Sequence, residues 1–298
     1  MMRIDAHVHV FARASAEFPR QTSAQLPAER EEPVEKLLRE MDQHGIDRAV
    51  LVQIGGAQLQ HHAYLQYCLK AHPGRFLGIG LLPDNIPSQL DHMDRLAERG
   101  AIIGFRLHHI GGPLDPFAPI DIRAFKTYPI WRHAAEKDYV LWLYPRAADA
   151  HLIPFLVEAF PQVRVVFNHL MICPGANALS WDERGRPRIN VAMDFPPTGY
   201  STLGLGHCEN VYIHLSGQYA LSKEEWPYRD LAGWHERLAR KSFTSDRLLW
   251  ASDFPWIVRH PGYGRLTRIA DELLPDLSVV ERGNIMGGNA KRLLQFSD

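Results

Sequence analysis

The stretch Val163-Arg164-Val165-Val166-Phe167-Asn168-His169 contains the pattern that decides the fold. It is apolar at all but one position up to Phe167, and it then ends in two polar side chains. A continuous apolar run is typical of a parallel strand that is covered on both faces. The stretch therefore predicts a buried parallel strand whose end presents His169.

Seven further short runs have the same character, and helical patterns separate most of them. Those patterns place apolar residues at three-to-four spacing, and most of them end at Gly or Pro. Strand–helix alternation repeated about eight times predicts a (β/α)8 barrel, a TIM barrel, rather than an open sheet. With Val163–His169, the predicted strands are Arg3–His9, Arg48–Ile54, Phe76–Leu82, Ala101–His108, Tyr139–Tyr144, Val211–Ser216 and Leu248–Asp253. The predicted helices are Pro33–His44, Ala63–His72, Gln89–Arg99, Pro129–Lys137, Ala150–Phe160, Tyr228–Lys241 and Leu266–Leu274.

Three long connections interrupt this regular alternation. They span Phe11–Glu32, Gly111–Tyr128 and Leu170–Asn210, and each one follows the C-terminal end of a predicted strand. Active sites of α/β barrels are built at that end, so we expect long loops over the site. The chain shows no internal repeat and no shift in composition, which predicts a single domain over residues 1–298.

Composition excludes several classes of partner. The 298 residues are 46% hydrophobic and 22% charged, with a formal net charge of −1, which predicts neither a nucleic acid nor a membrane as partner. The three cysteines, Cys68, Cys173 and Cys208, form no paired motif, as is usual in a reducing compartment. No apolar run is long enough for a membrane span, and no signal-like segment opens the chain. We expect a cytoplasmic protein that acts on a small molecule, with a homodimer as a possible assembly.

Polar side chains at the predicted strand ends are the candidate site residues. His7 and His9 lie two apart on the first strand, so they point to one side, and neutral imidazole is the commonest protein ligand for zinc. Taken alone, this pair is a weak signal. His169 from the sixth strand and Asp253 from the eighth complete a plausible set of ligands for one divalent ion. An open coordination position would hold a water molecule and lower its pKa toward ~7.

The chain resembles the amidohydrolase superfamily, in particular its amidohydrolase-related branch, which contains lactonases of sugar acids and dicarboxylates and nonoxidative decarboxylases. The matching stretches follow one another in order from residue 3 to residue 294, nearly the whole chain. They are Ile4-Asp5-Ala6-His7-Val8-His9, Met41 through Gln53, Gly104-Phe105-Arg106-Leu107, Val166-Phe167-Asn168-His169-Leu170, His214-Leu215-Ser216-Gly217, Trp250-Ala251-Ser252-Asp253-Phe254-Pro255 and Gly287 through Leu294. Several are loose individually, but together they are specific.

The resemblance implies that His7, His9, His169 and Asp253 hold one divalent metal ion, zinc or alternatively manganese. It also implies that Asp253 is the base toward the attacking water. Binuclear members place a bridging lysine or glutamate on a middle strand, where this chain has Tyr144. A tyrosine cannot bridge two metals in that way, which favours a mononuclear site.

Other strand ends supply candidate substrate contacts, each with a structural alternative. Arg106 could hold a substrate carboxylate by a two-pronged hydrogen bond or serve as an ion-pair partner in the barrel mouth. Gln53, His108 and Tyr144 are further candidates for substrate binding. His214 is either a catalytic base near the metal or a buried histidine satisfied by a neighbour.

These residues together predict a metal-dependent hydrolase of a small carbonyl substrate, with a lactone as the preferred substrate. Asp253 would take a proton from water as it attacks the carbonyl, and the ion or Arg106 would stabilise the oxyanion. The first alternative is nonoxidative decarboxylation of an aromatic or unsaturated acid at the same site, with His214 as a proton donor. The second is a noncatalytic barrel that binds a small acid. The sequence leaves the substrate open, and it does not decide whether His214 or His207 faces the site.

Overall fold

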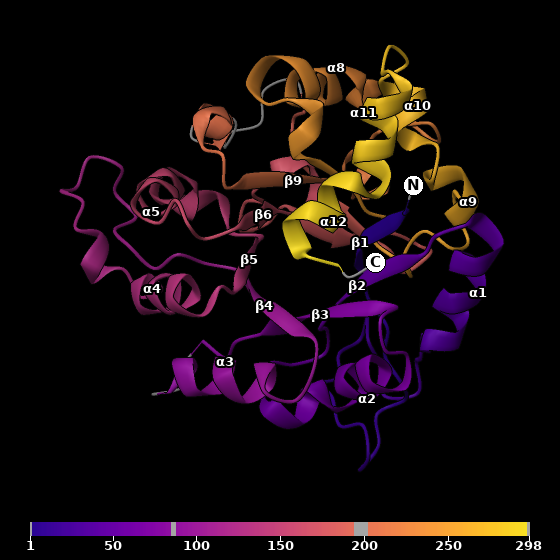
Figure 1. The fold of residues 1–298 in the computed structure, drawn as a ribbon, viewed down its shortest axis with the longest axis horizontal. Helices are drawn as coiled ribbons and strands as arrows, with labels where there is room; N and C mark the ends of the chain where they lie inside the picture. Colours follow the sequence, from indigo (N-terminus) through magenta and orange to yellow (C-terminus); the bar gives the residue numbers. More distant parts are fainter. Residues whose placement is uncertain (1, 85–87, 194–201, 297–298) are drawn as a thin grey trace.

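A computed structural model describes residues 2–84, 88–193 and 202–296 of the chain. Eight parallel strands form one sheet in the order β1-β2-β3-β4-β5-β6-β9-β10, and helices surround it (Figure 1). This is the (β/α)8 barrel that the alternation of patterns predicts. Its strands are β1 (Ile4–Val8), β2 (Arg48–Val52), β3 (Phe76–Leu81), β4 (Ile102–Leu107), β5 (Val140–Leu143), β6 (Val165–Phe167), β9 (Val211–Leu215) and β10 (Leu248–Trp250).

The outer layer consists of helices that alternate with these strands. Gly45 ends the first helix in the left-handed conformation, with φ of 64°, as the sequence predicts. The described helices are α1 (Val34–His44), α2 (Ala63–Ala71), α3 (Gln89–Ala97), α4 (Tyr128–Lys137), α5 (Ile153–Ala159), α7 (Gln218–Leu221), α8 (Ala232–Glu236), α9 (Tyr263–Leu266), α10 (Ile269–Leu273), α11 (Val279–Gly283) and α12 (Asn289–Leu294). Within the described part of the chain, none of them has the length and apolar composition to cross a bilayer.

The first and last strands meet at a seam that closes the barrel. Val8 forms a parallel bridge with Phe254, and the backbone amide of His9 donates to the Phe254 carbonyl at 2.7 Å. One residue earlier, the Asp253 amide donates to the His7 carbonyl at 3.0 Å. The Asp5 carboxylate reinforces the seam, because it accepts the amide of Ser252 at 2.8 Å. The seam therefore places the C-terminal ends of the first and last barrel strands side by side.

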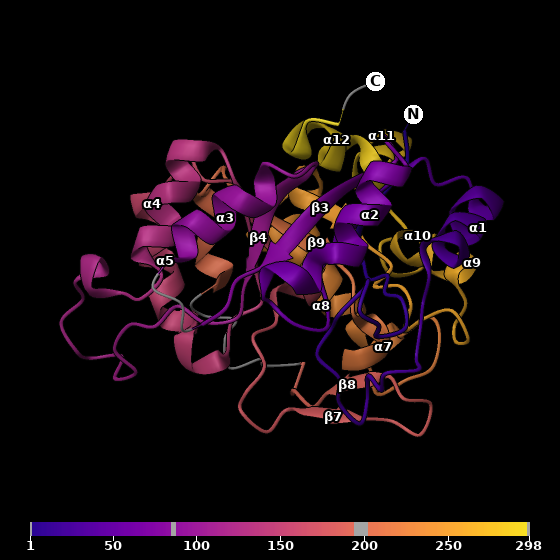
Figure 2. The ribbon, with the colours of Figure 1, turned by 90° about the horizontal axis from the view of Figure 1, so that it is seen from below.

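The barrel interior is filled by side chains from alternate strand positions. Ile4, Val52, Ile79 and Trp142 are fully or almost fully buried there, and residues of α12 close the interior at one end. Both termini lie at that end, whereas the opposite end carries the long loops (Figure 2). The C-terminal ends of the strands therefore open under the loops, which is where we expect the site.

The long connection after β6 has a structure that its composition does not predict. It contains an antiparallel hairpin, β7 (Leu179–Trp181) and β8 (Pro187–Ile189), at the loop end of the barrel (Figure 2). The expectation of a long connection over the site holds, and the hairpin is an addition that the sequence analysis did not make. Part of this connection, residues 194–201, lies outside the described residues.

Two predicted helices differ from the helices of the structure in winding or extent. The helix expected over Tyr228–Lys241 is α-helical only in α8, and a wider π-helical turn continues it from Arg237 to Ser242. The helix expected over Leu266–Leu274 is divided into α9 and α10. The first segment is helical without a break from Arg229, as predicted, whereas the prediction of one helix over Leu266–Leu274 is wrong. Apolar spacing marks a buried face but does not fix how tightly the backbone winds.

Candidate functional site

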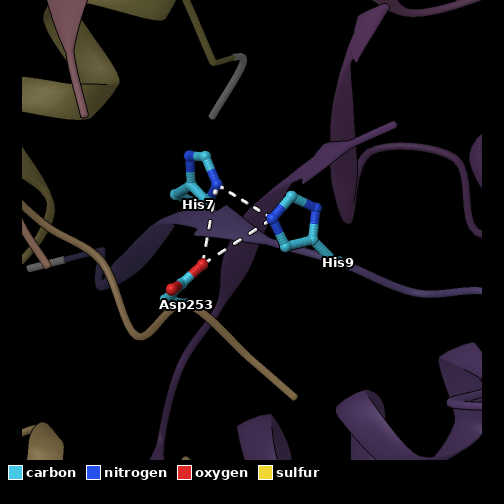
Figure 3. A group of neighbouring side chains, drawn as sticks. All are labelled: His7, His9 and Asp253. Carbon is cyan, nitrogen blue, oxygen red and sulfur yellow. Dashed lines mark hydrogen bonds and ion pairs between the residues drawn. The ribbon is translucent and has the colours of Figure 1, made fainter. Parts of the chain in front are cut away.

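Three buried side chains converge at the seam between β1 and β10. The Nε2 atoms of His7 and His9 are 3.2 Å apart, and each is 3.7 Å from Oδ1 of Asp253 (Figure 3). One nitrogen or oxygen of each residue lies within 4.8 Å of the others. We call His7, His9 and Asp253 the seam group. Two imidazoles and one carboxylate are a donor set that divalent transition metals accept.

A local irregularity of β1 aims the two histidines. Between Asp5 and Val8 the pairing with β2 shifts, because three steps along β1 match two steps from Ala49 to Leu51. Asp5 consequently bonds outward to the Tyr263 hydroxyl at 2.8 Å, while His7, two residues on, lies in the barrel interior. An extra residue of this kind re-aims a side chain, and bulges are common beside active sites.

Burial keeps the two histidines of the seam group neutral and favours the protonated form of the carboxyl group. Burial, and then the charge of Arg106, lowers the pKa of His9 to about 3, and burial holds the pKa of His7 well below its usual value. Burial also raises the pKa of Asp253 to about 6. Neutral imidazoles are the form that binds metal, so neither histidine has to lose a net proton before an ion binds near pH 7.

Hydrogen bonds to the remaining ring nitrogens set the histidine tautomers. Nδ1 of His9 lies 2.8 Å from the Val52 carbonyl, which can only accept, so this nitrogen carries the proton. Nδ1 of His7 lies 3.2 Å from the indole Nε1 of Trp142, which can only donate. Trp142 is a site residue that the sequence analysis missed, although it shares strand parity with Tyr144.

His169 lies beside the seam group but outside it. Its ring centroid is 5.5 Å from that of His7, and its Nδ1 is 3.0 Å from the Ser216 hydroxyl. His169, Leu170 and Met171 all have positive φ, between 43° and 62°, so β6 ends in a left-handed turn. Gly217 makes room for this turn, because a Cβ there would lie 2.9 Å from His169.

His214 lies against His7 and is not among the residues that line the cavity described below. Its ring is 5.3 Å from His7 and 5.2 Å from Trp142, fully buried, and neither ring nitrogen has a hydrogen-bond partner among the described residues. Burial, and then the Arg106 charge, lowers its pKa to about 3. The expectation that a neighbour satisfies this histidine is therefore wrong, and its place below His7 does not favour a catalytic role.

A cavity of about 190 Å³ opens above these residues. Its wall contains His9, His169 and Asp253 from the candidate metal ligands, and Arg106 and Tyr144 from the predicted substrate contacts. The hairpin β7–β8 covers it with Leu179, Ser180, Trp181, Pro187 and Ile189. This volume suits a small molecule, since pockets for drug-sized ligands begin at roughly 300 Å³.

Arg106 brings a positive charge to the cavity. The Asn168 amide, with its oxygen turned toward Arg106, accepts from Nε and Nη2 at 3.1 and 3.0 Å. The guanidinium also lies 5.0 Å from the centre of the Tyr144 ring. Both partners are neutral, so the charge of Arg106 is available to an anionic group in the cavity.

Tyr219 is a second residue that the sequence analysis missed. It lies on α7, just after β9, and its buried hydroxyl donates to Oδ2 of Asp253 at 2.7 Å. The other carboxylate oxygen, Oδ1, is buried with no hydrogen-bond partner among the described residues. Tyr219 therefore fixes which oxygen of Asp253 faces His7 and His9. Its only signal in the sequence is its place after the seventh barrel strand.

The cavity wall does not include the candidates Gln53, His108 and His207, although the His108 ring lies 6.2 Å from that of Tyr144, which does line it. The Gln53 side-chain nitrogen donates to the carbonyls of Ile54, Gly56 and His61, so it holds the loop after β2, and the cavity wall does not include it. His108 is exposed and lines a different hollow beside that loop. His207 is also exposed. The structure thus gives Gln53 a structural role instead of the predicted contact with substrate.

The residues at the seam fit a divalent metal ion. The unpartnered Oδ1 of Asp253 is a buried carboxylate oxygen that lacks a donor, and a cation would compensate it. His9 offers an Nε2 lone pair, since its proton is held at Nδ1 by Val52. His169 can offer Nε2 in the same manner when its Nδ1 donates to Ser216.

Solved structures with this fold span hydrolases and decarboxylases. A putative 2-pyrone-4,6-dicarboxylic acid hydrolase from Pseudomonas putida is 21% identical, with a TM-score of 0.71, and the alignment covers 100% of this chain and 98% of that one. An amidohydrolase from Burkholderia multivorans with bound zinc is 19% identical, with a TM-score of 0.73 and full coverage of both chains. A dihydroxybenzoic acid decarboxylase from Polaromonas sp. JS666 with bound manganese is 15% identical, with a TM-score of 0.61 and coverage of 99% and 97%. At these identities the likeness shows the fold.

Sequence comparison assigns the family. No curated protein sequence matches the chain. The model of one family, the amidohydrolases, matches residues 4–296 in a single continuous alignment. That match includes β1, β10 and every candidate site residue. The chain therefore belongs to the amidohydrolase family.

Proposed function

We propose that this protein is a metal-dependent hydrolase of a small, carboxylate-bearing lactone. The observation that carries the proposal is the buried, unpartnered Oδ1 of Asp253, 3.7 Å from the Nε2 atoms of His7 and His9. His7, His9, Asp253 and His169 would hold the metal. When bound, the ion would lower the pKa of a coordinated water and polarise the substrate carbonyl.

The side chains of the cavity divide the remaining chemistry. Asp253 accepts a proton as the water oxygen attacks the carbonyl carbon, and it returns a proton to the ring oxygen when the carbon–oxygen bond breaks. Tyr219 donates to Oδ2 and so keeps Oδ1 turned toward His7 and His9, where the metal would lie. Arg106 binds the carboxylate of the substrate from the wall of the cavity. Small volume and one free positive charge together favour a compact organic acid.

The position of His214 favours hydrolysis over decarboxylation. Decarboxylation at this site would use a proton donor such as His214 beside the carbon that loses carbon dioxide. His214 lies beneath His7 and does not line the cavity. A substrate held by Arg106 would therefore contact Asp253 and His169 but not His214.

The substitution Asp253→Asn tests the proposal on a panel of carboxylated lactones. We expect turnover to fall roughly 10²–10⁴-fold, the usual contribution of a general base, with an unchanged far-ultraviolet spectrum. Asp149→Asn is the matched control, because Asp149 is a buried aspartate whose carboxylate accepts the Ile110 amide and lies outside the cavity wall. Full activity in Asp253→Asn would overturn the proposal. Release of carbon dioxide without formation of a new carboxylic acid would show that the protein is a decarboxylase instead of a lactone hydrolase.

A further inference from the structure

The hydrogen bonds around His7 specify a tautomer that a metal ligand cannot keep. The indole nitrogen of Trp142 only donates, so its 3.2 Å contact makes Nδ1 of His7 the acceptor. In a neutral imidazole the proton then lies on Nε2, the nitrogen that faces His9 and Asp253. A metal ion would need the lone pair of that same nitrogen.

His9 has the opposite tautomer and completes a chain of donors and acceptors. Its Nδ1 donates to the Val52 carbonyl at 2.8 Å, so its Nε2 accepts. The 3.2 Å contact between the two Nε2 atoms is therefore a bond from His7 to His9. From Trp142 through His7 and His9 to Val52, each ring nitrogen has the partner that it requires. This chain of four residues is self-consistent without a cation.

We propose that metal binding is coupled to a tautomer change of His7, and that Trp142 sets the metal affinity by opposing this change. For His7 to offer Nε2, its proton must move to Nδ1. An N–H would then face the N–H of Trp142 at a spacing that suits one donor and one acceptor. Binding replaces the bond from His7 to His9 by two bonds to the ion, but the bond from Trp142 is lost without replacement and two donors are brought together. His9 and His169 need no such change.

This inference rests on the metal site of the proposed function but not on its reaction. The donor–donor contact exists only at His7, because Val52 and Ser216 can both accept from the histidines that they contact. Removing the indole N–H should make it easier for His7 to carry its proton on Nδ1, and it should leave the metal ligands in place. One net hydrogen bond corresponds to about a threefold to tenfold change in affinity.

Zinc affinity of Trp142→Phe, measured by competition with a chromophoric chelator, tests the coupling. We expect this variant to bind zinc about three to ten times more tightly than the natural protein. Trp131→Phe is the matched control, because Trp131 is fully buried in α4 and its indole N–H has no partner among the described residues. Its zinc affinity should not change. Equal or weaker binding by Trp142→Phe would overturn the proposal.

A second measurement needs no stable Trp142 variant. In protein labelled with ¹⁵N-histidine, the ring nitrogens report the tautomer, and His7→Gln identifies the His7 signals by their loss. We expect the Nε2–H form of His7 without metal and the Nδ1–H form after zinc is added. An Nδ1–H tautomer in the metal-free protein would overturn the proposal. Failure of the lactone assay would leave both readouts intact, so the two proposals fail separately.

Discussion

The seam group and His169 are held by two different kinds of backbone. His7 and His9 lie on β1, and Asp253 follows β10, where strand-to-strand hydrogen bonds fix the spacing of the three. His169 lies on a left-handed turn that no sheet bond defines. The hydrogen-bond partners of the two Nδ1 atoms differ as well. Nδ1 of His9 contacts a backbone carbonyl, whereas Nδ1 of His169 contacts a side-chain hydroxyl. The seam is therefore built by topology, whereas the turn depends on individual side chains.

The largest effect should come from removing a ligand on the seam side. We expect His9→Gln to weaken zinc binding roughly a hundredfold to a thousandfold, because a zinc site of four ligands is worth ~10–16 kcal/mol in total. His169→Gln should cost clearly less, since His169 lies outside the group of atoms within 4.8 Å of one another. Zinc titrations of both variants check this order. Equal losses would show that the four residues act as one site.

A glycine supports the turn, and replacing it should come next in size. A Cβ at Gly217 would lie 2.9 Å from three atoms of His169, so Gly217→Ala should displace that ring and reduce zinc affinity about tenfold to a hundredfold. Gly74→Ala is the control, because Gly74 has a similar positive φ of 77° with open space around it. In both variants an alanine must adopt a positive φ, which costs stability. Only Gly217→Ala should also bind zinc more weakly. Unchanged zinc binding in Gly217→Ala would separate His169 from the metal site.

The pH dependence of zinc binding should identify a single titrating group on the seam. Burial raises the pKa of Asp253 to about 6, so below pH 6 a proton must leave before the ion binds. The pKa of His9 is lowered to about 3, so His9 adds no competing proton above that value. Zinc affinity should therefore be constant above pH 6 and fall about tenfold for each pH unit from 6 to 4. A slope near three would mean that the histidines are protonated as well.

The smallest effect should come from the hydroxyl that orients His169. Ser216→Ala removes the partner at 3.0 Å from Nδ1, and loss of such an outer contact costs about tenfold in metal affinity. Ser245→Ala, a buried serine bonded to Glu281 outside the cavity, provides the comparison. No single side-chain substitution removes the equivalent partner of His9, since that partner is the Val52 carbonyl. An unaffected Ser216→Ala would mean that the turn holds His169 without this bond.

The same contrast explains what could be predicted from the sequence. Continuous apolar runs define buried parallel strands, so the barrel and the polar strand ends followed from residue types alone. The bulge between Asp5 and Val8 could not be predicted, because it depends on how β1 fits against β2. The positive φ of His169, Leu170 and Met171 has no signal either, since none of them is glycine. Tyr219 and the hairpin β7–β8 belong to connections whose conformation depends on tertiary contacts.

Because the barrel closes between its first and last strands, the site forms only after both strands are in place. The side chain of Asp5 bonds to Ser252 across 247 positions of sequence, next to the residues that would hold the ion. A chain released before β10 has formed carries both histidines of β1 but neither Asp253 nor the seam that positions it. Such a fragment lacks the carboxylate of the seam group. Metal uptake would therefore report that the first and last strands of the barrel have met.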